Sequence, residues 1–171
     1  GMTISGGEPL MQFDFTRAIV MAGKAAGLHV CIETNGFTSW ANLEILRPTV
    51  DLFLYDYKET DPVRHREFTG QLNEEILSNL RRLDAVGASI LLRCPIIPGY
   101  NLREDHLAGI AELAQSLRHC RGVNVMGYHR LGTSKRERLA MVPETVGSNV
   151  AAMLDADVEA GTITLVVQEV G

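Results

Sequence analysis

The sequence predicts an α/β fold with a parallel sheet, shaped as a partial (βα) barrel of the TIM type. Short apolar segments alternate with helical segments along the chain, which is the rhythm of parallel strands joined by right-handed crossovers. An open doubly wound sheet has the same rhythm. The polar residues favour the barrel, because they stand where strands end, and barrel sites form on the loops at that face.

Each expected element follows from a local pattern. Strands are apolar runs bounded by Gly, Pro or Asn, and helices carry apolar residues at helical spacing. The run 50–57 is almost wholly apolar, as expected for a strand covered on both faces. The expected strands are 2–5, 29–33, 50–57, 89–97, 123–128 and 162–168. The expected helices are 14–26, 39–46 (with Ser39 as its cap), a short one after Asp61-Pro62, 74–86, 102–117 and 144–159.

Composition bounds the class of protein. A chain of 171 residues that is 46% hydrophobic and 22% charged is expected to fold as a single globular domain, 1–171. A net charge of −5 and a pI near 5.5 argue against nucleic acid or a membrane surface as partner. No apolar run approaches the ~20 residues of a membrane span, and the start has no signal-peptide pattern. We therefore expect a cytoplasmic protein.

Charged side chains of both signs stand at the expected strand ends. Asp56 and Lys58 are two residues apart on one strand and point the same way. Such charges are costly to bury unless they meet partners. A ring of carboxylates and cations at one barrel mouth would supply those partners and would suit a ligand that bears an amino group and a carboxylate. The members of this ring are Glu8, Glu33, Asp56, Lys58, Arg93 and His129.

One short motif carries a family resemblance. Gly6-Gly7-Glu8-Pro9 directly follows the first expected strand and resembles the GGEP motif of radical S-adenosylmethionine (SAM) enzymes. Glycines let a backbone approach a ligand closely, and the carbonyl and carboxylate groups there can accept hydrogen bonds from the ammonium of SAM. The competing interpretation is a tight turn with a solvated glutamate.

Four further segments extend the resemblance in chain order. Segment 32–36 is similar to a D/E-T-N-G motif, and segment 56–79 to a D-x-K…D…H…T/V-G…N…I…N run. Segment 93–101 is similar to R-x-P-x-[IV]-P-G-x-N, and segment 128–135 to Y-H-x-x-G…K. Together the motifs resemble the glycyl-radical-activating branch of the radical SAM superfamily, which includes pyruvate formate-lyase activating enzymes.

The resemblance implies a role for each motif residue. Gly6, Gly7 and Glu8 would take the methionyl amino group of SAM, Lys58 and Arg93 would meet its carboxylate, and His129 would contact its ribose. Pro9, Asn35 and Asp56 belong to the same expected cofactor-binding set. Glu33, Thr34 and Asp56 occupy positions that hold a monovalent cation in pyruvate formate-lyase activating enzymes, with Glu33 in place of the usual aspartate.

Other interpretations of these side chains remain open. Glu33, Asp56 and Lys58 could simply pair across strand ends, Arg93 could be a structural ion-pair residue, and His129 could be an ordinary loop histidine. An unrelated barrel enzyme, an aldolase or isomerase, would use Lys58 for Schiff-base or acid–base chemistry.

The resemblance also implies an iron–sulfur cofactor. The family holds a 4Fe–4S cluster on a C-x-x-x-C-x-x-C loop upstream of GGEP, whereas the cysteines here are Cys31, Cys94 and Cys120. We therefore expect that the chain lacks the first barrel strand and the cluster loop, and that it binds no cluster and is inactive by itself.

The resemblance implies that the complete protein would receive an electron from a flavodoxin or ferredoxin-type donor. It would then generate a 5′-deoxyadenosyl radical and abstract a hydrogen from a glycine of a partner glycyl-radical enzyme. The alternative is a cluster-less half-barrel that binds SAM, a nucleotide or a protein.

Overall fold

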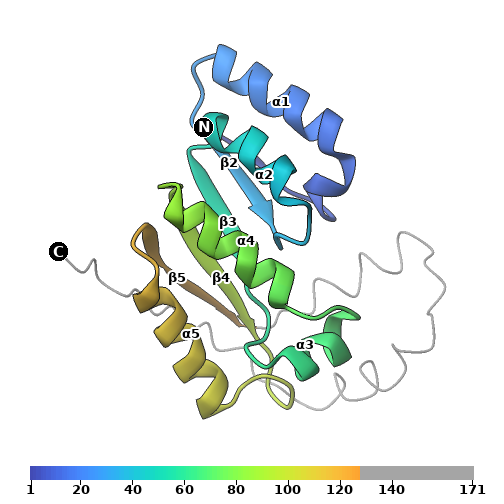
Figure 1. The fold of residues 1–171 in the computed structure, drawn as a ribbon, viewed down its shortest axis with the longest axis vertical. Coiled ribbons are helices and arrows are strands. Elements are labelled where there is room, and N and C mark those ends of the chain that lie inside the picture. Colours follow the sequence, from blue (N-terminus) through green and yellow to red (C-terminus); the bar gives the residue numbers. More distant parts are fainter. Residues whose placement is uncertain (128–171) are drawn as a thin grey trace.

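Five parallel strands form one open sheet in the computed structural model, which describes residues 1–127 (Figure 1). The strands pair in chain order, each with the next. They are β1 (Met2–Ile4), β2 (Val30–Thr34), β3 (Leu52–Asp56), β4 (Ile90–Ile96) and β5 (Cys120–Gly127). This arrangement is that of the predicted partial TIM-type barrel. Because the strands are parallel, all their carboxyl ends lie at one edge of the sheet, where the expected site residues stand.

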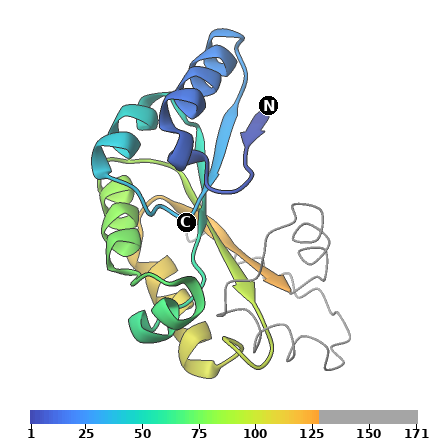
Figure 2. The same cartoon turned by 90° about the vertical axis from the view of Figure 1, so that its right-hand side faces the viewer.

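The helices gather on one side of the sheet, as Figure 2 shows. They are α1 (Phe13–Ala25), α2 (Trp40–Leu46), α3 (Pro62–Thr69), α4 (Glu74–Ala85) and α5 (Glu104–Ser116), with 3₁₀ turns η1 (Pro9–Gln12) and η2 (Arg47–Thr49). All five expected helices before residue 128 are present. The expected helix 144–159 and strand 162–168 lie outside the described residues.

Alternation along the strands separates a core from a second face. On β2 to β4, every other side chain faces the helices and is buried, including Ile32, Phe53, Tyr55 and Leu92 at 0% exposure. The residues between them are only partly buried and lie on the face without helices. Consecutive residues of one strand therefore contribute to the core and to the opposite face in turn.

Helix α3 is delimited by the residues that the sequence pattern indicates. Asp61 is its N-cap, and the carboxylate accepts hydrogen bonds from the backbone N–H groups of Val63 (2.8 Å) and Arg64 (2.9 Å). Gly70 ends the helix in a left-handed conformation, with φ of 83°. Ser39 precedes α2 as expected, but its side chain makes no capping hydrogen bond.

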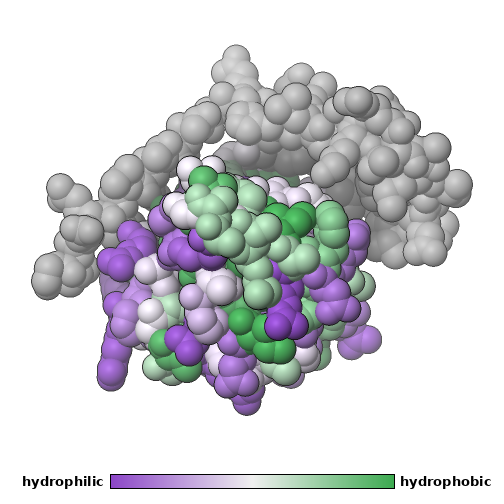
Figure 3. Space-filling model, turned by 90° about the horizontal axis from the view of Figure 1, so that it is seen from above, coloured by the Kyte–Doolittle hydropathy of each residue, from purple (hydrophilic) through white to green (hydrophobic). Residues whose placement is uncertain are grey.

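The surface of the described residues is mixed in polarity. Figure 3, which looks onto the end of the molecule above α1, shows apolar patches among hydrophilic side chains. Large apolar residues that are exposed include Met11, Phe15 and Met21. Within residues 1–127, no helix combines the length and apolar character that crossing a membrane requires.

Candidate functional site

Four charged side chains meet near the carboxyl ends of β2 and β3 and the middle of β4. Asp56 and Arg93 are register partners on adjacent strands, so their side chains emerge on the same face. Arg93 Nη1 forms an ion pair with Glu33 Oε1 and lies 3.7 Å from Asp56 Oδ1. Lys58 Nζ lies 3.9 Å from Asp56 Oδ2. Strands β2, β3 and β4, with the residues that directly follow β3, thus bring together two carboxylates and two cations from three separate parts of the sequence.

Asp56 has an unused hydrogen-bonding atom within this cluster. Its Oδ1 is buried and accepts no hydrogen bond from the described residues. Burial raises the pKa of Asp56; Lys58 and Arg93 lower it, Glu33 and Glu8 raise it, and the net shift is upward. A buried acceptor without a partner is costly, so this atom is suited to a ligand that donates a hydrogen bond or carries positive charge.

The Gly6-Gly7-Glu8-Pro9 loop is tied to the end of β2 through Glu8. The Glu8 carboxylate accepts hydrogen bonds from Thr34 Oγ1 (2.8 Å), Asn35 N (2.9 Å) and Leu10 N (3.1 Å). This glutamate is therefore not simply solvated. Because protein donors engage its carboxylate, backbone carbonyls are the acceptors that the loop most readily offers to a ligand.

The two glycines give the loop an open backbone. Gly6 has φ of 101° and Gly7 has φ of 58°, conformations that other residues rarely adopt. A Cβ atom on either residue would meet no atom within 4 Å. The fold thus requires glycine here for conformation, and the space beside the backbone is free for a ligand.

The turn after β2 is built by buried hydrogen bonds. Thr34 Oγ1 donates to Glu8 and accepts from Gly36 N (3.0 Å). Asn79 of α4 donates its side-chain amide to the carbonyls of Gly36 (2.9 Å) and Thr38 (2.7 Å). Gly36 packs against the Tyr55 ring so closely that a Cβ would overlap it. The D/E-T-N-G segment therefore holds the loop geometry as well as its candidate ligand-binding residues.

The side chains of the expected cation site point in different directions. Thr34 is buried toward the helices, whereas its neighbour Glu33 lies on the opposite face with Asp56. Of this set, the structure brings together only Glu33 and Asp56, which share Arg93. Residues 1–127 contain no group of three or more His, Cys, Asp or Glu arranged for a metal ion.

The three cysteines are dispersed over the sheet. They are free thiols on three different strands, β2, β4 and β5. Cys94 faces the core, and burial raises the pKa of its thiol to about 12. Burial also raises the pKa of Cys120, partly offset by backbone hydrogen bonds. Because the three thiols stand on three strands and burial raises the pKa of two of them, the described residues do not fit a 4Fe–4S cluster.

A small pocket of about 80 Å³ adjoins the charged cluster. His65 lies 97% buried in its wall, and its Nδ1 is 2.6 Å from the Gln71 carbonyl oxygen. The sequence analysis included His65 only as part of the motif in segment 56–79 and did not predict where its side chain lies. The pocket is lined by Asn35, Phe37, Asp56, Lys58, His65, Thr69, Gln71 and Ile76.

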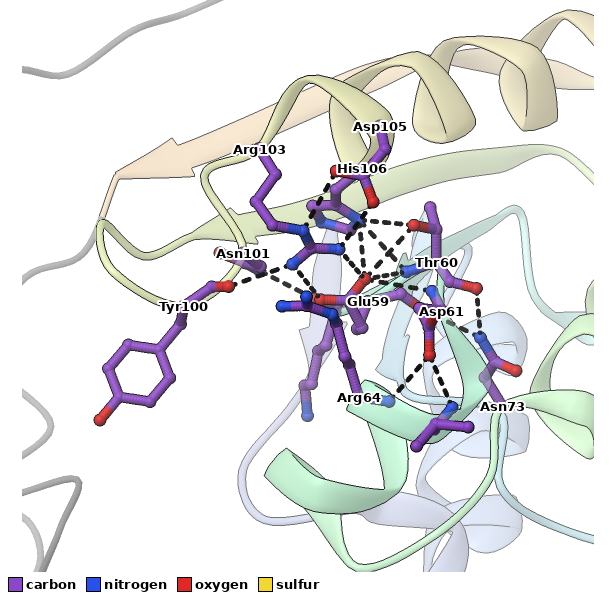
Figure 4. A network of polar contacts seen from close by, with 12 residues as sticks. Glu59, Thr60, Asp61, Arg64, Asn73, Tyr100, Asn101, Arg103, Asp105 and His106 are labelled. Atoms are coloured by element: carbon purple, nitrogen blue, oxygen red, sulfur yellow. Dashed lines mark hydrogen bonds and ion pairs between the residues drawn. The ribbon is translucent and has the colours of Figure 1, made fainter.

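Sequence reasoning missed the buried polar network next to Lys58, shown in Figure 4. Glu59 has 0% exposure and accepts two hydrogen bonds from Arg103, at 2.9 and 3.0 Å. An acidic residue in the polar segment after a strand usually faces solvent, so the sequence held no signal of this burial. His129, with the rest of the expected segment 128–135, lies outside the described residues.

Comparisons with known proteins agree with the family resemblance of the sequence motifs. The family model of the radical SAM superfamily matches residues 1–114. An isethionate sulfite-lyase activating enzyme of Nitratidesulfovibrio vulgaris is 43% identical over 139 residues, which are 79% of this chain and 44% of the relative. A choline trimethylamine-lyase activating enzyme of Oleidesulfovibrio alaskensis is 36% identical over 93% of this chain and 52% of the relative. The chain thus spans about half the length of these curated relatives.

Solved structures share the fold. A domain of a pyruvate formate-lyase-activating enzyme from Bacteroides vulgatus superposes with a TM-score of 0.71 at 28% identity, over 90% of this chain and 92% of that domain. Streptococcus suis SuiB, solved bound to S-adenosylmethionine, has a TM-score of 0.66 at 16% identity, over 75% of this chain and 30% of SuiB. The fold, the motif order and the match over residues 1–114 lead to one conclusion: this chain belongs to the radical SAM superfamily.

Proposed function

We propose that this chain is the SAM-binding part of an enzyme that activates a glycyl-radical enzyme. The observation that carries the proposal is the meeting of Lys58, Arg93 and Asp56, whose Oδ1 accepts no hydrogen bond from the described residues. SAM carries an ammonium and a carboxylate on its methionyl end, so a site with acceptors and cations side by side matches it in charge. Curated relatives that activate glycyl-radical enzymes support the choice of branch.

Different residues bind different parts of the methionyl group. The open backbone of Gly6 and Gly7 accepts hydrogen bonds from the ammonium, and Glu8 fixes that loop against β2. Lys58 and Arg93 face the carboxylate. Asp56 Oδ1 takes a donor from the ligand, or a cation that accompanies it. Pro9 begins η1 and Asn35 donates to Glu8, so both shape the loop edges.

A calorimetric titration with SAM tests this assignment. The 171-residue chain is expected to bind SAM, and Lys58→Met is expected to weaken binding about 10-fold or more, since a hydrogen bond to a charged group contributes about 1.5–3 kcal/mol. Lys24→Met is the matched control, because Lys24 pairs with Asp51 (2.8 Å), which precedes β3 at the opposite end of that strand. Equal losses in both variants would contradict the assignment.

The 4Fe–4S cluster of the complete enzyme would supply the electron that cleaves SAM, delivered by a flavodoxin or ferredoxin-type donor. The described residues hold, orient and neutralise SAM and do not ligate this cluster. We therefore expect less than stoichiometric iron after anaerobic reconstitution of the chain. A full cluster per chain with a typical absorption spectrum would overturn this expectation.

The protein substrate would be a glycyl-radical enzyme, with a glycine hydrogen as the atom transferred. A second function is favoured by the dispersal of the cysteines: the chain acts as a SAM-binding or protein-docking half-barrel without catalysis. The two are distinguished by adding a chain that carries C-x-x-x-C-x-x-C and measuring 5′-deoxyadenosine release. Release supports the activating enzyme, whereas SAM binding without release supports the binding module.

A further inference from the structure

The loop after β3 and the loop after β4 are fastened together by a buried network (Figure 4). Glu59 accepts hydrogen bonds from Arg103 at 2.9 and 3.0 Å, from Thr60 N at 2.9 Å and from Asp61 N at 3.1 Å. Arg103 belongs to the loop that precedes α5, so the ion pair joins two loops across 44 residues of sequence. This network begins one residue after Lys58.

Asn101 makes the contact to Lys58 itself. Its side-chain amide donates to the carbonyl oxygens of Lys58 (2.8 Å) and Pro95 (2.8 Å), and its Oδ1 accepts from Ile97 N (2.6 Å). The side chain is 3% exposed. Its donors and its acceptor are engaged by backbone groups, so Asn101 is occupied with the protein rather than with a ligand.

The place of these bonds matters because Lys58 lies beyond the strand. Strand β3 ends at Asp56, and the last ladder bond runs from Tyr57 N to Arg93 O (2.8 Å). After that bond the sheet no longer fixes the chain, and among residues 1–127 the side chain that bonds to the Lys58 backbone is that of Asn101. The second carbonyl that it holds belongs to Pro95, two residues beyond Arg93 on β4.

We infer that Asn101 is a positioning residue that sets the spacing between Lys58 and Arg93; the inference rests on the proposed function. Its amide group ties the backbone of Lys58 to β4, whose own position the sheet fixes through Arg93 and Pro95, so Lys58 is held at a fixed separation from Arg93. Preorganised cations bind a carboxylate more tightly than mobile ones, because less freedom is lost on binding. Asn101 therefore acts on SAM affinity through Lys58 and Arg93 without touching SAM.

The test compares Asn101→Ala with Asn79→Ala by titration with SAM. Asn79 is an equally buried asparagine, 3% exposed, whose amide also donates to two backbone carbonyls, but in the turn after β2. We expect Asn101→Ala to weaken SAM binding about 5-fold in the wild-type background and less than about 2-fold in a Lys58→Met background. Asn79→Ala should have the same effect in both backgrounds.

Decarboxylated SAM gives a second readout, because it lacks the group that the cations face. Asn101→Ala should change its affinity less than about 2-fold. Asn101→Leu, which keeps the approximate size and adds no charge but loses the amide, should behave like Asn101→Ala and serves where alanine prevents folding. A loss that is equal for both ligands, or that persists without Lys58, would show a merely structural role and overturn the inference.

Failure of the proposed function would look different. A wild-type chain that does not bind SAM contradicts the SAM site itself. The positioning is then read without ligand, from the NMR signal of the Lys58 side chain. Asn101→Ala should shift the Lys58 signal and Asn79→Ala should leave it in place; an unchanged Lys58 signal in Asn101→Ala would refute the positioning.

Discussion

Replacing Glu59 by glutamine should destabilise the fold strongly, although no candidate ligand contact is removed. Glu59 is fully buried and accepts five hydrogen bonds, two from the Arg103 guanidinium and three from Thr60 and Asp61. Glutamine keeps one oxygen acceptor and turns an NH₂ group toward the donors of Arg103. Arg103, which also donates to the Tyr100 carbonyl oxygen (3.1 Å), is left with Asp105 at 3.1 Å as its carboxylate partner. Because breaking a buried pair costs about 3–5 kcal/mol, and Arg103 keeps this second partner, we expect a loss of about 3 kcal/mol.

Urea unfolding followed by far-ultraviolet circular dichroism measures this loss. With a urea dependence of about 1–3 kcal/mol per molar, the midpoint should fall by about 1–3 M. Asp105→Asn is the control, because Asp105 contacts the same guanidinium from an exposed position, and its midpoint shift should be far smaller. The double variant Glu59→Gln/Arg103→Met should recover part of the loss, since no charge is then left buried without a partner. A loss below about 1 kcal/mol in Glu59→Gln would refute the reasoning.

Three further predictions concern other groups. Burial raises the pKa of Glu59, but hydrogen bonds from Arg103 and the backbone outweigh it, so the folded pKa is below its ordinary value of 4.5. The contribution of Glu59 to stability is therefore complete above pH 4.5 and is lost as the pH falls further, and the stability gap between wild type and Glu59→Gln should narrow there in urea titrations. Gly36→Ala should cost about 3 kcal/mol, because φ is +71° and the Cβ would overlap Tyr55, and a small midpoint shift in urea would contradict that packing. At pH 8, iodoacetamide should alkylate Cys31 before Cys94, whose pKa is raised to about 12 by burial; equal rates in the folded chain would show that Cys94 is accessible.

The sequence pattern predicted the order and type of the described elements because strand and helix periodicities differ. The errors of the prediction concern where the elements begin and end. The expected strand 123–128 begins three residues earlier, at Cys120, where a register irregularity at Ile90 and Leu91 lets the chain pair through Gly122. Gly122 and the polar residues around it are unusual in a strand, so the sequence pattern did not indicate that the strand begins at Cys120. Pairing with a neighbouring strand, which makes this segment a strand, cannot be seen in a local pattern.

The candidate site was only partly predictable. Alternation placed Asp56 with Lys58, and the structure joins them to Arg93 and Glu33. The partner of Glu8 was not predictable, because hydrogen bonds to Thr34 and Asn35 depend on how two loops meet in space. The role of Thr34 was equally unpredictable, because its side chain lies on the helix side of β2 and its hydroxyl donates a hydrogen bond to Glu8.

Alternating burial on β2 to β4 also has an evolutionary consequence. Mutations at Glu33, Leu54 or Leu91 fall on the face away from the helices, while Ile32, Phe53 and the other buried positions stay under a separate selection for packing. Side chains on that face can therefore change while the packing beneath the helices is preserved. For library design, the practical rule is to randomise every second strand residue and leave its neighbours alone.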